Sequence, residues 1–327
     1  MRIRFQRWLI QTCCSVALAI GWIAAAAQTY PSKPIRLIVT FPPGGPSDFV
    51  ARAIGQKLTE AWGQQVVVDN RGGAGGVVGV EAAARASPDG YTLLQGQSGG
   101  MSINPALHAK LSYDPFRDFA PVSMLVVNSQ MLVAHPSLPA KSVKQLIALA
   151  KDQPGRISYA SAGYGSAQHL GMEMLKAMAG IDLLHVPYKG TGPALVDLFS
   201  GQVSLQFTSM PAVLPHVRAG KLNGIAVGSA KRSPAAPDVP TVAESGVPGF
   251  EFVAWYGLFA PAATPQAIVK RLNAQIVKLL AEAELSQRLA SQGAEPSPST
   301  AAGLASYMRE DHERWKKVIR AANIRPD

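Results

Sequence analysis

The chain alternates short apolar runs with amphipathic stretches. Its first such run after the N-terminal region, Ile35–Phe41, is rich in β-branched residues and predicts a strand. Apolar residues then recur every four positions from Val50 to Leu58, and Gly63 supplies a stop, so a helix is predicted from about Ser47 to Trp62. A strand followed by an amphipathic helix is typical of α/β units.

The same alternation continues along the chain. Further strands are predicted at Val66–Val68, Tyr91–Leu94, Ile157–Ala160, Leu184–Pro187, Val203–Phe207 and Ile225–Val227, and regular structure is also expected in the apolar passages Val122–Ala134 and Phe252–Ala260. A helix should begin at Ser142, which fits a capping box with Gln145, and another should span Ser166–Ala179. The Pro-rich stretch Lys231–Pro248 predicts a lobe connection or a surface loop. The pattern from Thr264 to Ile319 is helical, and we expect this segment to pack back on the first lobe.

The first 27 residues have the layout of a secretory signal peptide. Arg2, Arg4 and Arg7 precede an apolar stretch, and the small residues Ala25 and Ala27 match what a signal peptidase requires. A retained membrane anchor is the alternative, but the apolar stretch is at the short end for a bilayer span. We therefore expect an exported periplasmic protein that is cleaved near Ala27.

Composition excludes several classes of function. Both cysteines, Cys13 and Cys14, lie in the segment expected to be removed, so disulfide and thiolate chemistry are not expected. The formal net charge of +10 is scattered, without the dense basic runs of a nucleic-acid-binding protein. The six histidines have no close pair with ligand spacing, so we expect neither a metal nor a cofactor. About 300 mature residues exceed one core, which predicts two lobes.

Two glycine-rich segments join a predicted strand to a predicted helix. These are Phe41–Asp48 and Tyr159–His169. Glycine lets the backbone approach a ligand, and the free N–H groups of a first helical turn attract a carboxylate or phosphate. The alternative in both places is an ordinary capped helix start.

Three other segments are weaker candidates. Asn70–Gly79 nearly matches a dinucleotide fingerprint, but Val78 stands where the third glycine is required, so close backbone packing or a second cleft loop is preferred. Val186–Pro193 and Gln206–Met210 end predicted strands, where open α/β sheets bind ligands. In the first of these two segments, Lys189 either attracts an anionic ligand by its charge or is a solvated residue of a turn.

Ser166 and His169 raise the question of catalysis. No GxSxG motif surrounds the serine, and His169 is poorly placed as an in-line base, so a capping role is favoured. An exported hydrolase acting on carboxylates is nevertheless the alternative from another class of function, with these two residues as its candidates.

Ordered motifs over nearly the whole mature chain resemble one family. They include YPSKPIRLIVTFPPGGPSD, VVVDNRGGAGGVVG, YASAGYGSAQHL, HVPYKGTGPALVDLFSGQV and WYGLFAPAATP. The chain thereby resembles the extracytoplasmic receptors of tripartite tricarboxylate transporters, also called Bug receptors.

The resemblance implies an α/β, type II periplasmic binding protein fold, in which two α/β lobes enclose a ligand cleft. The expected lobes are residues 28–129 with 250–327, and residues 130–249. It also implies a receptor, not an enzyme, that captures a small organic carboxylate: a di- or tricarboxylate, an aromatic acid or a related anion. We expect the receptor to be a monomer. The partners are then membrane transporter subunits, or the receptor serves as a sensor.

The resemblance also places a ligand site on particular residues. It carries the carboxylate site onto Pro43, Gly44, Gly45, Ser47, Asp48, Gly163, Gly165, Ser166 and His169. From their place at neighbouring strand ends, Lys189, Gly190, Thr208 and Ser209 are further candidate ligand residues. The family commonly has an aspartate where Thr208 stands, and an acid there could hold a ligand amine, so the threonine favours other organic acids. Trp255 and Tyr256 are expected either to close over the distal end of the ligand or to pack at the lobe junction.

Overall fold

The computed structural model describes residues 30–321 and 324. The signal peptide predicted for residues 1–27 therefore lies outside the described residues. Within them, no helix combines the length and the apolar character needed to cross a bilayer.

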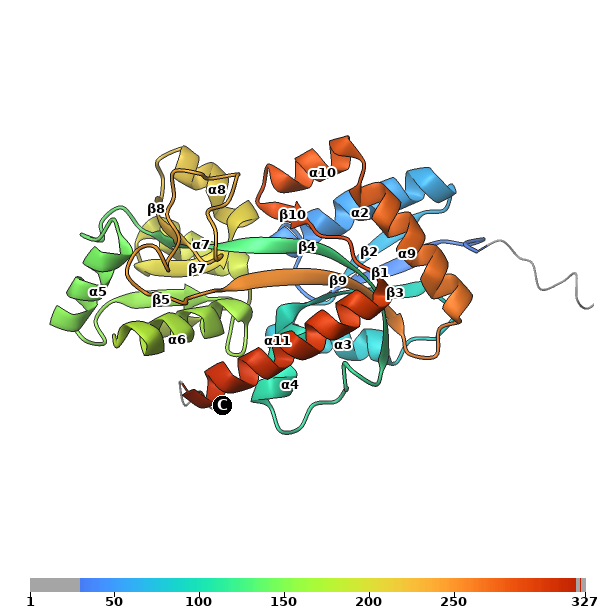
Figure 1. The fold of residues 1–327 in the computed structure, drawn as a ribbon, viewed down its shortest axis with the longest axis horizontal. Helices are drawn as coiled ribbons and strands as arrows, with labels where there is room; N and C mark the ends of the chain where they lie inside the picture. The colour runs from blue at the N-terminus through green and yellow to red at the C-terminus, as the bar shows by residue number, and fades with distance from the viewer. Residues whose placement is uncertain (1–29, 322–323, 325–327) are drawn as a thin grey trace, which may run out of the picture.

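The strands of the described chain form one extended sheet with the order β2-β1-β3-β9-β4-β7-β5-β6, and β8 and β10 also pair with β4 (Figure 1). Their bounds are β1 Ile35–Val39, β2 Val66–Asn70, β3 Thr92–Gln97, β4 Phe119–Ala134, β5 Ser158–Ser161, β6 Leu184–Pro187, β7 Leu205–Ser209, β8 Asn223–Val227, β9 Val253–Pro261 and β10 Ala294–Pro296. The predicted strands are thus present, with small differences at their ends.

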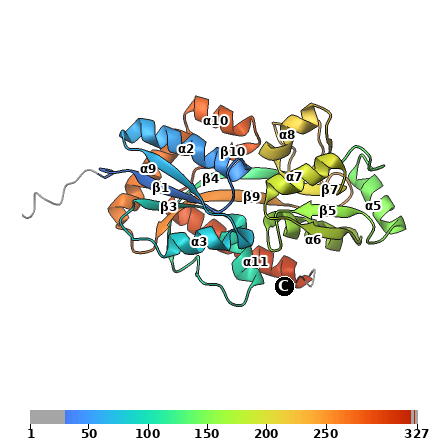
Figure 2. The same ribbon diagram turned by 180° about the vertical axis from the view of Figure 1, so that it is seen from behind.

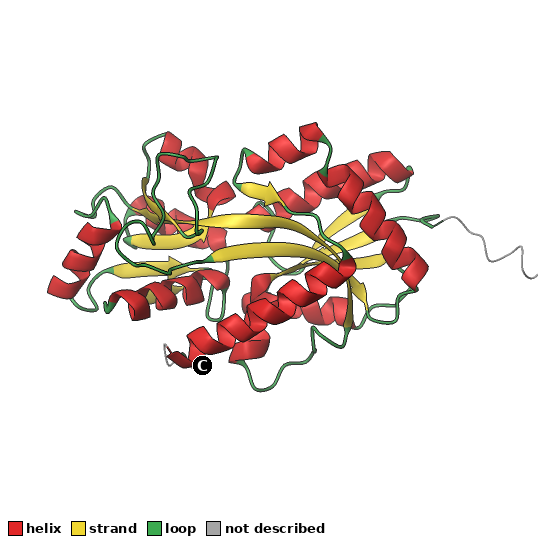
Figure 3. Cartoon of the chain, in the orientation of Figure 1, coloured by secondary structure: helices red, strands yellow, loops and turns green. Residues whose placement is uncertain are grey.

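Two lobes share this sheet, and the long strand β4 joins them. From Phe119 to Ser129 it pairs with β9, whereas from Gln130 to Ala134 it pairs with β7. Figure 3 shows β4 and β9 as long strands that run through both halves of the molecule. The first lobe contains β1, β2, β3 and β10, and the second contains β5 to β8, so the fold is that of a two-lobed binding protein.

Helices cover both faces of the sheet in each lobe. The helices are α2 Pro46–Trp62, α3 Val77–Ala84, α4 Asn104–Leu107, α5 Val143–Asp152, α6 Ala167–Ala179, α7 Thr191–Ser200, α8 Met210–Arg218, α9 Gln266–Leu280, α10 Ala283–Ala290 and α11 Ala301–Ala321, with short turns η1 Ala74–Gly76 and η2 Gly99–Ile103. In the first lobe, α2, α9 and α10 bury their apolar residues on one face, while α3 packs on the other (Figure 2). In the second lobe, α5 and α6 cover one face and α7 and α8 the other. Apolar burial on both faces explains why these strands are nearly continuous hydrophobic runs.

The Pro-rich connection from β8 to β9 has no helix or strand in the described structure apart from an isolated bridge at Thr241. It is more than a surface loop, because Val242, Val247 and Phe250 are buried in the core of the second lobe. The segment returns the chain from the second lobe to β9.

The C-terminal helix α11 departs from its prediction. Leu304 and Met308 pack in the core of the first lobe, as expected, but Trp315 and Ile319 belong to the core of the second. The expectation that the whole C-terminal segment packs on the first lobe is therefore wrong for its last turns. The physical reason is length, since 21 residues of α-helix span about 30 Å and carry one apolar stripe past the lobe boundary.

Helix α11 is tied to β9 by a buried polar contact. The Trp255 indole Nε1 donates to Asp311 Oδ2 at 2.7 Å, and both residues are buried. Arg314 pairs with the same carboxylate.

We expect Trp255→Phe to lower the free energy of unfolding by about 1–3 kcal/mol, because it leaves a buried carboxylate oxygen without its donor.

Urea denaturation measures this effect, with Trp62→Phe, a partly exposed position, as the matched control. Equal stability of the two variants would contradict the structural role given to the indole N–H.

Candidate functional site

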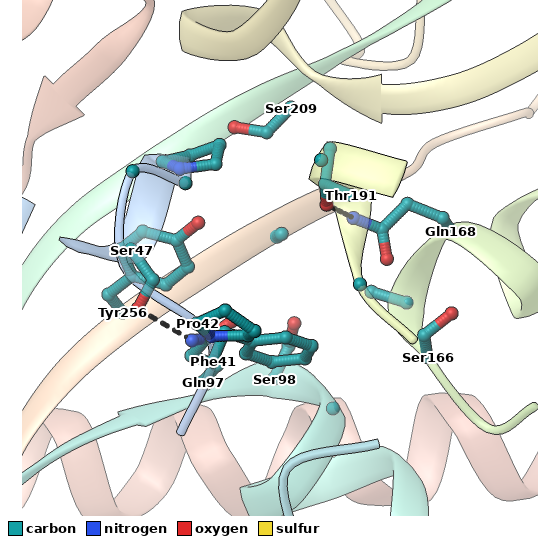
Figure 4. A pocket seen from close by; sticks show the side chains of 18 of the residues that line it. Phe41, Pro42, Ser47, Gln97, Ser98, Ser166, Gln168, Thr191, Ser209 and Tyr256 are labelled. Carbon is teal, nitrogen blue, oxygen red and sulfur yellow. Dashed lines mark hydrogen bonds between the residues drawn. The ribbon is translucent and has the colours of Figure 1, made fainter. Parts of the chain in front are cut away.

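A cavity of about 190 Å³ lies between the lobes where α2, α6 and α7 begin (Figure 4). Eight residues predicted from the sequence line it: Pro43, Gly44, Gly45, Ser47, Ser166, Gly190, Ser209 and Tyr256. Eight further lining residues lie in segments that the sequence singled out, although they were not named as contacts: Phe41, Pro42, Pro46, Ala167, Gln168, Thr191, Gly192 and Pro193. Sequence reasoning missed the remaining five: Gln97, Ser98, Gly99, Gln130 and Ala254. The volume suits a small molecule.

Three helix N-termini meet at this cavity. Helices α2 and α7 begin after Gly45 and Gly190, and neither start has a side-chain cap. Gly190 has a φ of 129°, a conformation that favours glycine. Helix α6 begins after Ser166, whose Oγ accepts from the backbone N–H of His169 at 3.3 Å. First-turn N–H groups and helix dipoles thus give the cavity a positive potential.

No charged side chain of the described structure lines the cavity. Among the residues that line it in the described structure, none is Asp, Glu, Lys, Arg or His. Attraction for an anion must therefore come from backbone and neutral side-chain dipoles. Such a site discriminates by the direction of its donors rather than by a single opposite charge.

The hydroxyl of Ser47 is directed by two amides. Its Oγ accepts from Gln95 Nε2 at 2.8 Å and from Gln97 Nε2 at 2.7 Å. A hydroxyl oxygen has two lone pairs, and these two bonds occupy both of them. The Ser47 hydroxyl can then form a further hydrogen bond only by donating its proton. Ser47 therefore faces the cavity as a donor, and Gln97, itself a lining residue, holds it there.

Asp48 lies behind the cavity rather than in its wall. Its Oδ2 accepts from the backbone N–H of Gly44 at 3.0 Å and from Arg52 Nε at 2.8 Å. Burial by itself would raise the pKa of this carboxyl, but the hydrogen bonds from Arg52 and Gly44 outweigh burial and hold the pKa below its usual value. Asp48 thus fixes the loop that presents Gly44 and Gly45.

Two stacked imidazoles support the other helix start. The ring of His169 lies 4.2 Å from that of His185, and its Nδ1 accepts from the Gly165 N–H at 3.3 Å. His185 Nε2 lies 2.7 Å from Ser161 Oγ. Burial, with smaller effects of His169 and Lys176, lowers the pKa of His185 to about 3, so this ring is neutral at physiological pH.

Gly165 has a φ of 69° and sits against the first lobe, where a Cβ would lie 3.0 Å from Asn104 Oδ1. Like Gly163 and His169, it was predicted as a ligand contact. These three residues do not line the cavity. They shape the loop before α6, whose first residues do.

Lys189, Thr208 and Trp255 also lie outside the cavity wall. Lys189 is exposed, and Thr208 lies opposite Met131 in the β4–β7 ladder, on the face covered by α7 and α8. Side chains alternate along a strand, so Tyr256 and Trp255 point to opposite faces of β9. Tyr256 lines the cavity, while Trp255 packs in the core of the first lobe.

The missed lining residues had only weak sequence signals. Gln97 lines the cavity, and Gln95 lies two positions before it in a mostly buried strand, a spacing that places both side chains on one face. Gln130 ends a run of three polar residues, Asn128 to Gln130, inside a long apolar strand. A polar side chain inside a buried strand needs a hydrogen-bond partner. Such side chains in apolar strands are therefore the sequence signal by which these residues could have been identified.

Two α/β lobes, joined by long strands and enclosing a cavity at three helix starts, define a solute-binding protein. Comparison with known proteins agrees, because residues 50–324 match the tripartite tricarboxylate transporter family receptor. The chain belongs to this family.

Relatives with known sequences and solved structures are similar over nearly their whole length. Protein BugT of Bordetella pertussis is 39% identical over 308 residues, covering 93% of this chain and 94% of BugT. The R. palustris protein Rpa4515, solved with adipate, is 36% identical with a TM-score of 0.89, covering 91% of this chain and 100% of that one. MatC from Rhodopseudomonas palustris, solved with bound malate, is 35% identical with a TM-score of 0.84 over 89% of this chain and 100% of MatC.

The lowered pKa of Asp48 gives a pH-dependent prediction. A carboxyl whose folded pKa is depressed stabilises the folded protein above its unfolded pKa, and this contribution is lost as the pH falls through the folded pKa. We expect Asp48→Asn to lower the free energy of unfolding at pH 7 by on the order of 1 kcal/mol. The difference from the parent should narrow steadily on acidification.

Urea titrations at pH 7 and at several acidic values measure the difference. Asp152→Asn, at an exposed position on α5, is the matched control and should change little. A difference between parent and Asp48→Asn that is constant at all pH values would contradict the ion pair's role.

Proposed function

We propose that this protein is a periplasmic receptor that captures a small organic carboxylate and delivers it, unchanged, to the membrane subunits of a tripartite tricarboxylate-type transporter or to a sensor. The observation that carries the proposal is the convergence of three helix N-termini on an uncharged cavity between two lobes. The related structures solved with adipate and malate support a carboxylate as the ligand.

A buried carboxylate is costly unless several donors satisfy its oxygens. Backbone N–H groups at the starts of α2 and α7, together with the Ser47 hydroxyl, can supply these donors from both lobes. Donors on both sides bring the lobes together around the anion, so binding biases the protein towards its closed form. Because the closed receptor differs in shape from the open one, transporter subunits can distinguish the loaded receptor from the empty receptor.

We further propose the lobe division predicted above, residues 28–129 with 250–327 and residues 130–249, except that the last turns of α11, with Trp315 and Ile319, pack on the second lobe. The change of partner along β4, between Ser129 and Gln130, supports this division. Cleavage near Ala27, a monomeric state and the absence of nucleic-acid binding complete the proposal. The scattered charge of the chain supports the last of these.

Calorimetry tests the carboxylate directly. We expect a small organic acid to bind, its primary amide analogue to bind at least tenfold more weakly, and Ser47→Ala to weaken binding of the acid by about 10- to 100-fold, because a donor to the anion is lost and two glutamine amides lose their acceptor. Ser291→Ala, at an exposed position, is the control. Equal affinity for acid and amide would count against the proposal.

Binding without turnover separates the receptor from the hydrolase alternative. The Ser166 hydroxyl is engaged as a helix cap by the His169 N–H, which supports a structural role for it. We therefore expect NMR of the bound acid to show no conversion during prolonged incubation. Appearance of a product that Ser166→Ala abolishes, with binding retained, would overturn the receptor function.

A further inference from the structure

One part of the cavity wall is polar but uncharged, and it lies on the strands that join the lobes. Gln130 and Ser209 lie directly opposite each other in the β4–β7 ladder, and both line the cavity. Directly opposite residues project to the same face of a sheet. Ala254 and Tyr256 of β9 line the cavity as well, and Figure 4 shows the side chains of Ser209 and Tyr256 beside it.

The orientation of the Gln130 amide is fixed by its neighbour. Its Nε2 donates to the backbone carbonyl of Asn128 at 3.3 Å, and a carbonyl can only accept. Oε1 is therefore the other end of the amide. This oxygen is buried, as is Gln130 as a whole, which is 1% exposed. It has no hydrogen-bond partner among the described residues. A buried acceptor without a donor is unfavourable, so Oε1 is left able to accept a hydrogen bond from a ligand.

Asn128 extends the same polar strip. It lies opposite Ala254, two residues from Gln130 and on the same face of β4, and both of its side-chain polar atoms are buried without a partner among the described residues. The rest of the wall includes the ring of Phe41 and several prolines. The cavity thus combines donors at the helix starts, an apolar wall and a neutral strip with a free acceptor.

We infer that the ligand of this receptor carries, besides its carboxylate, an uncharged group that donates a hydrogen bond, such as a hydroxyl or a primary amide, and that Gln130 Oε1 accepts from it. This inference rests on the proposed carboxylate function and specifies its ligand class.

Other distal groups fit this strip less well. A second carboxylate could accept from the hydroxyls of this wall, but it brings only acceptors to Oε1 and has no cationic lining residue to offset its charge. An ammonium group can donate, but it would be buried without an acidic partner in the cavity wall. A methyl group leaves Oε1 unpaired. Gln130 is therefore a specificity-determining residue.

Matched ligands test the inference by calorimetry. One series is hexanoate, 6-hydroxyhexanoate, adipate and 6-aminohexanoate, and the other is benzoate, 4-hydroxybenzoate, terephthalate and 4-(aminomethyl)benzoate. In the series that fits the cavity, we expect the hydroxy acid to bind about tenfold or more tightly than the other three members. Tightest binding of the dicarboxylate, the amino acid or the unsubstituted acid overturns the inference and leaves the carboxylate function standing. Failure of all eight compounds to bind folded protein counts against the function itself.

Variants of Gln130 assign the preference to this side chain. In Gln130→Leu, the advantage of the hydroxy acid over the unsubstituted acid should fall to less than threefold, whereas Gln287→Leu, the same change at an exposed position of α10, should keep it. In Gln130→Glu, the preference should move from the hydroxy acid to the amino acid, because the new carboxylate pairs with an ammonium. Thermal melting shows that each variant is folded. An unchanged order of affinities in both folded Gln130 variants overturns the role of this residue.

Discussion

The organisation of this protein depends on how an anion can be buried without a charged partner. Dipoles solve the problem only if several point at the same place, because each contributes a fraction of a charge. Three helices must then begin around one cavity, although α2 lies more than a hundred residues from α6 and α7 in the chain. The sheet achieves this arrangement, since α2, α6 and α7 each follow the end of a parallel strand and the two lobes face each other across β4 and β9.

Most charged and aromatic residues near the site act one layer behind it. Asp48 accepts a hydrogen bond from the Gly44 N–H, and His169 accepts one from the Gly165 N–H. Each bond fixes the conformation of a loop that contributes residues to the cavity wall. Charge kept behind the wall leaves the wall itself neutral, and the ligand then meets donors of fixed direction. This division of labour explains why several expected contact residues lie close to the cavity without lining it.

The sequence predicted the fold more fully than the site. Strands and long helices follow from apolar periodicity, but α7 was not predicted, because Gly190, Gly192 and Pro193 at its start resemble a loop. Trp255 and Tyr256 are adjacent and chemically alike, so their sequence does not distinguish them. Their roles differ because Trp255 lies on the face of β9 that packs against α11, whereas Tyr256 lies on the face that lines the cavity. The bond from Gln95 to Ser47 joins residues 48 positions apart, and no local pattern encodes such a pairing. Residues at helix starts were found because local chemistry marks them, whereas those on the joining strands depend on tertiary register.

Helix α11 has a consequence for how the molecule moves and unfolds. Leu304 and Met308 are part of one core and Trp315 and Ile319 part of the other, so the two lobes share a rigid rod as well as two long strands. Relative motion of the lobes is then a rotation about this rod and the joining strands, which restricts its range and direction. Neither lobe can lose its packing without exposing apolar surface that belongs to the other. The protein should accordingly unfold as one cooperative unit despite its bilobal shape.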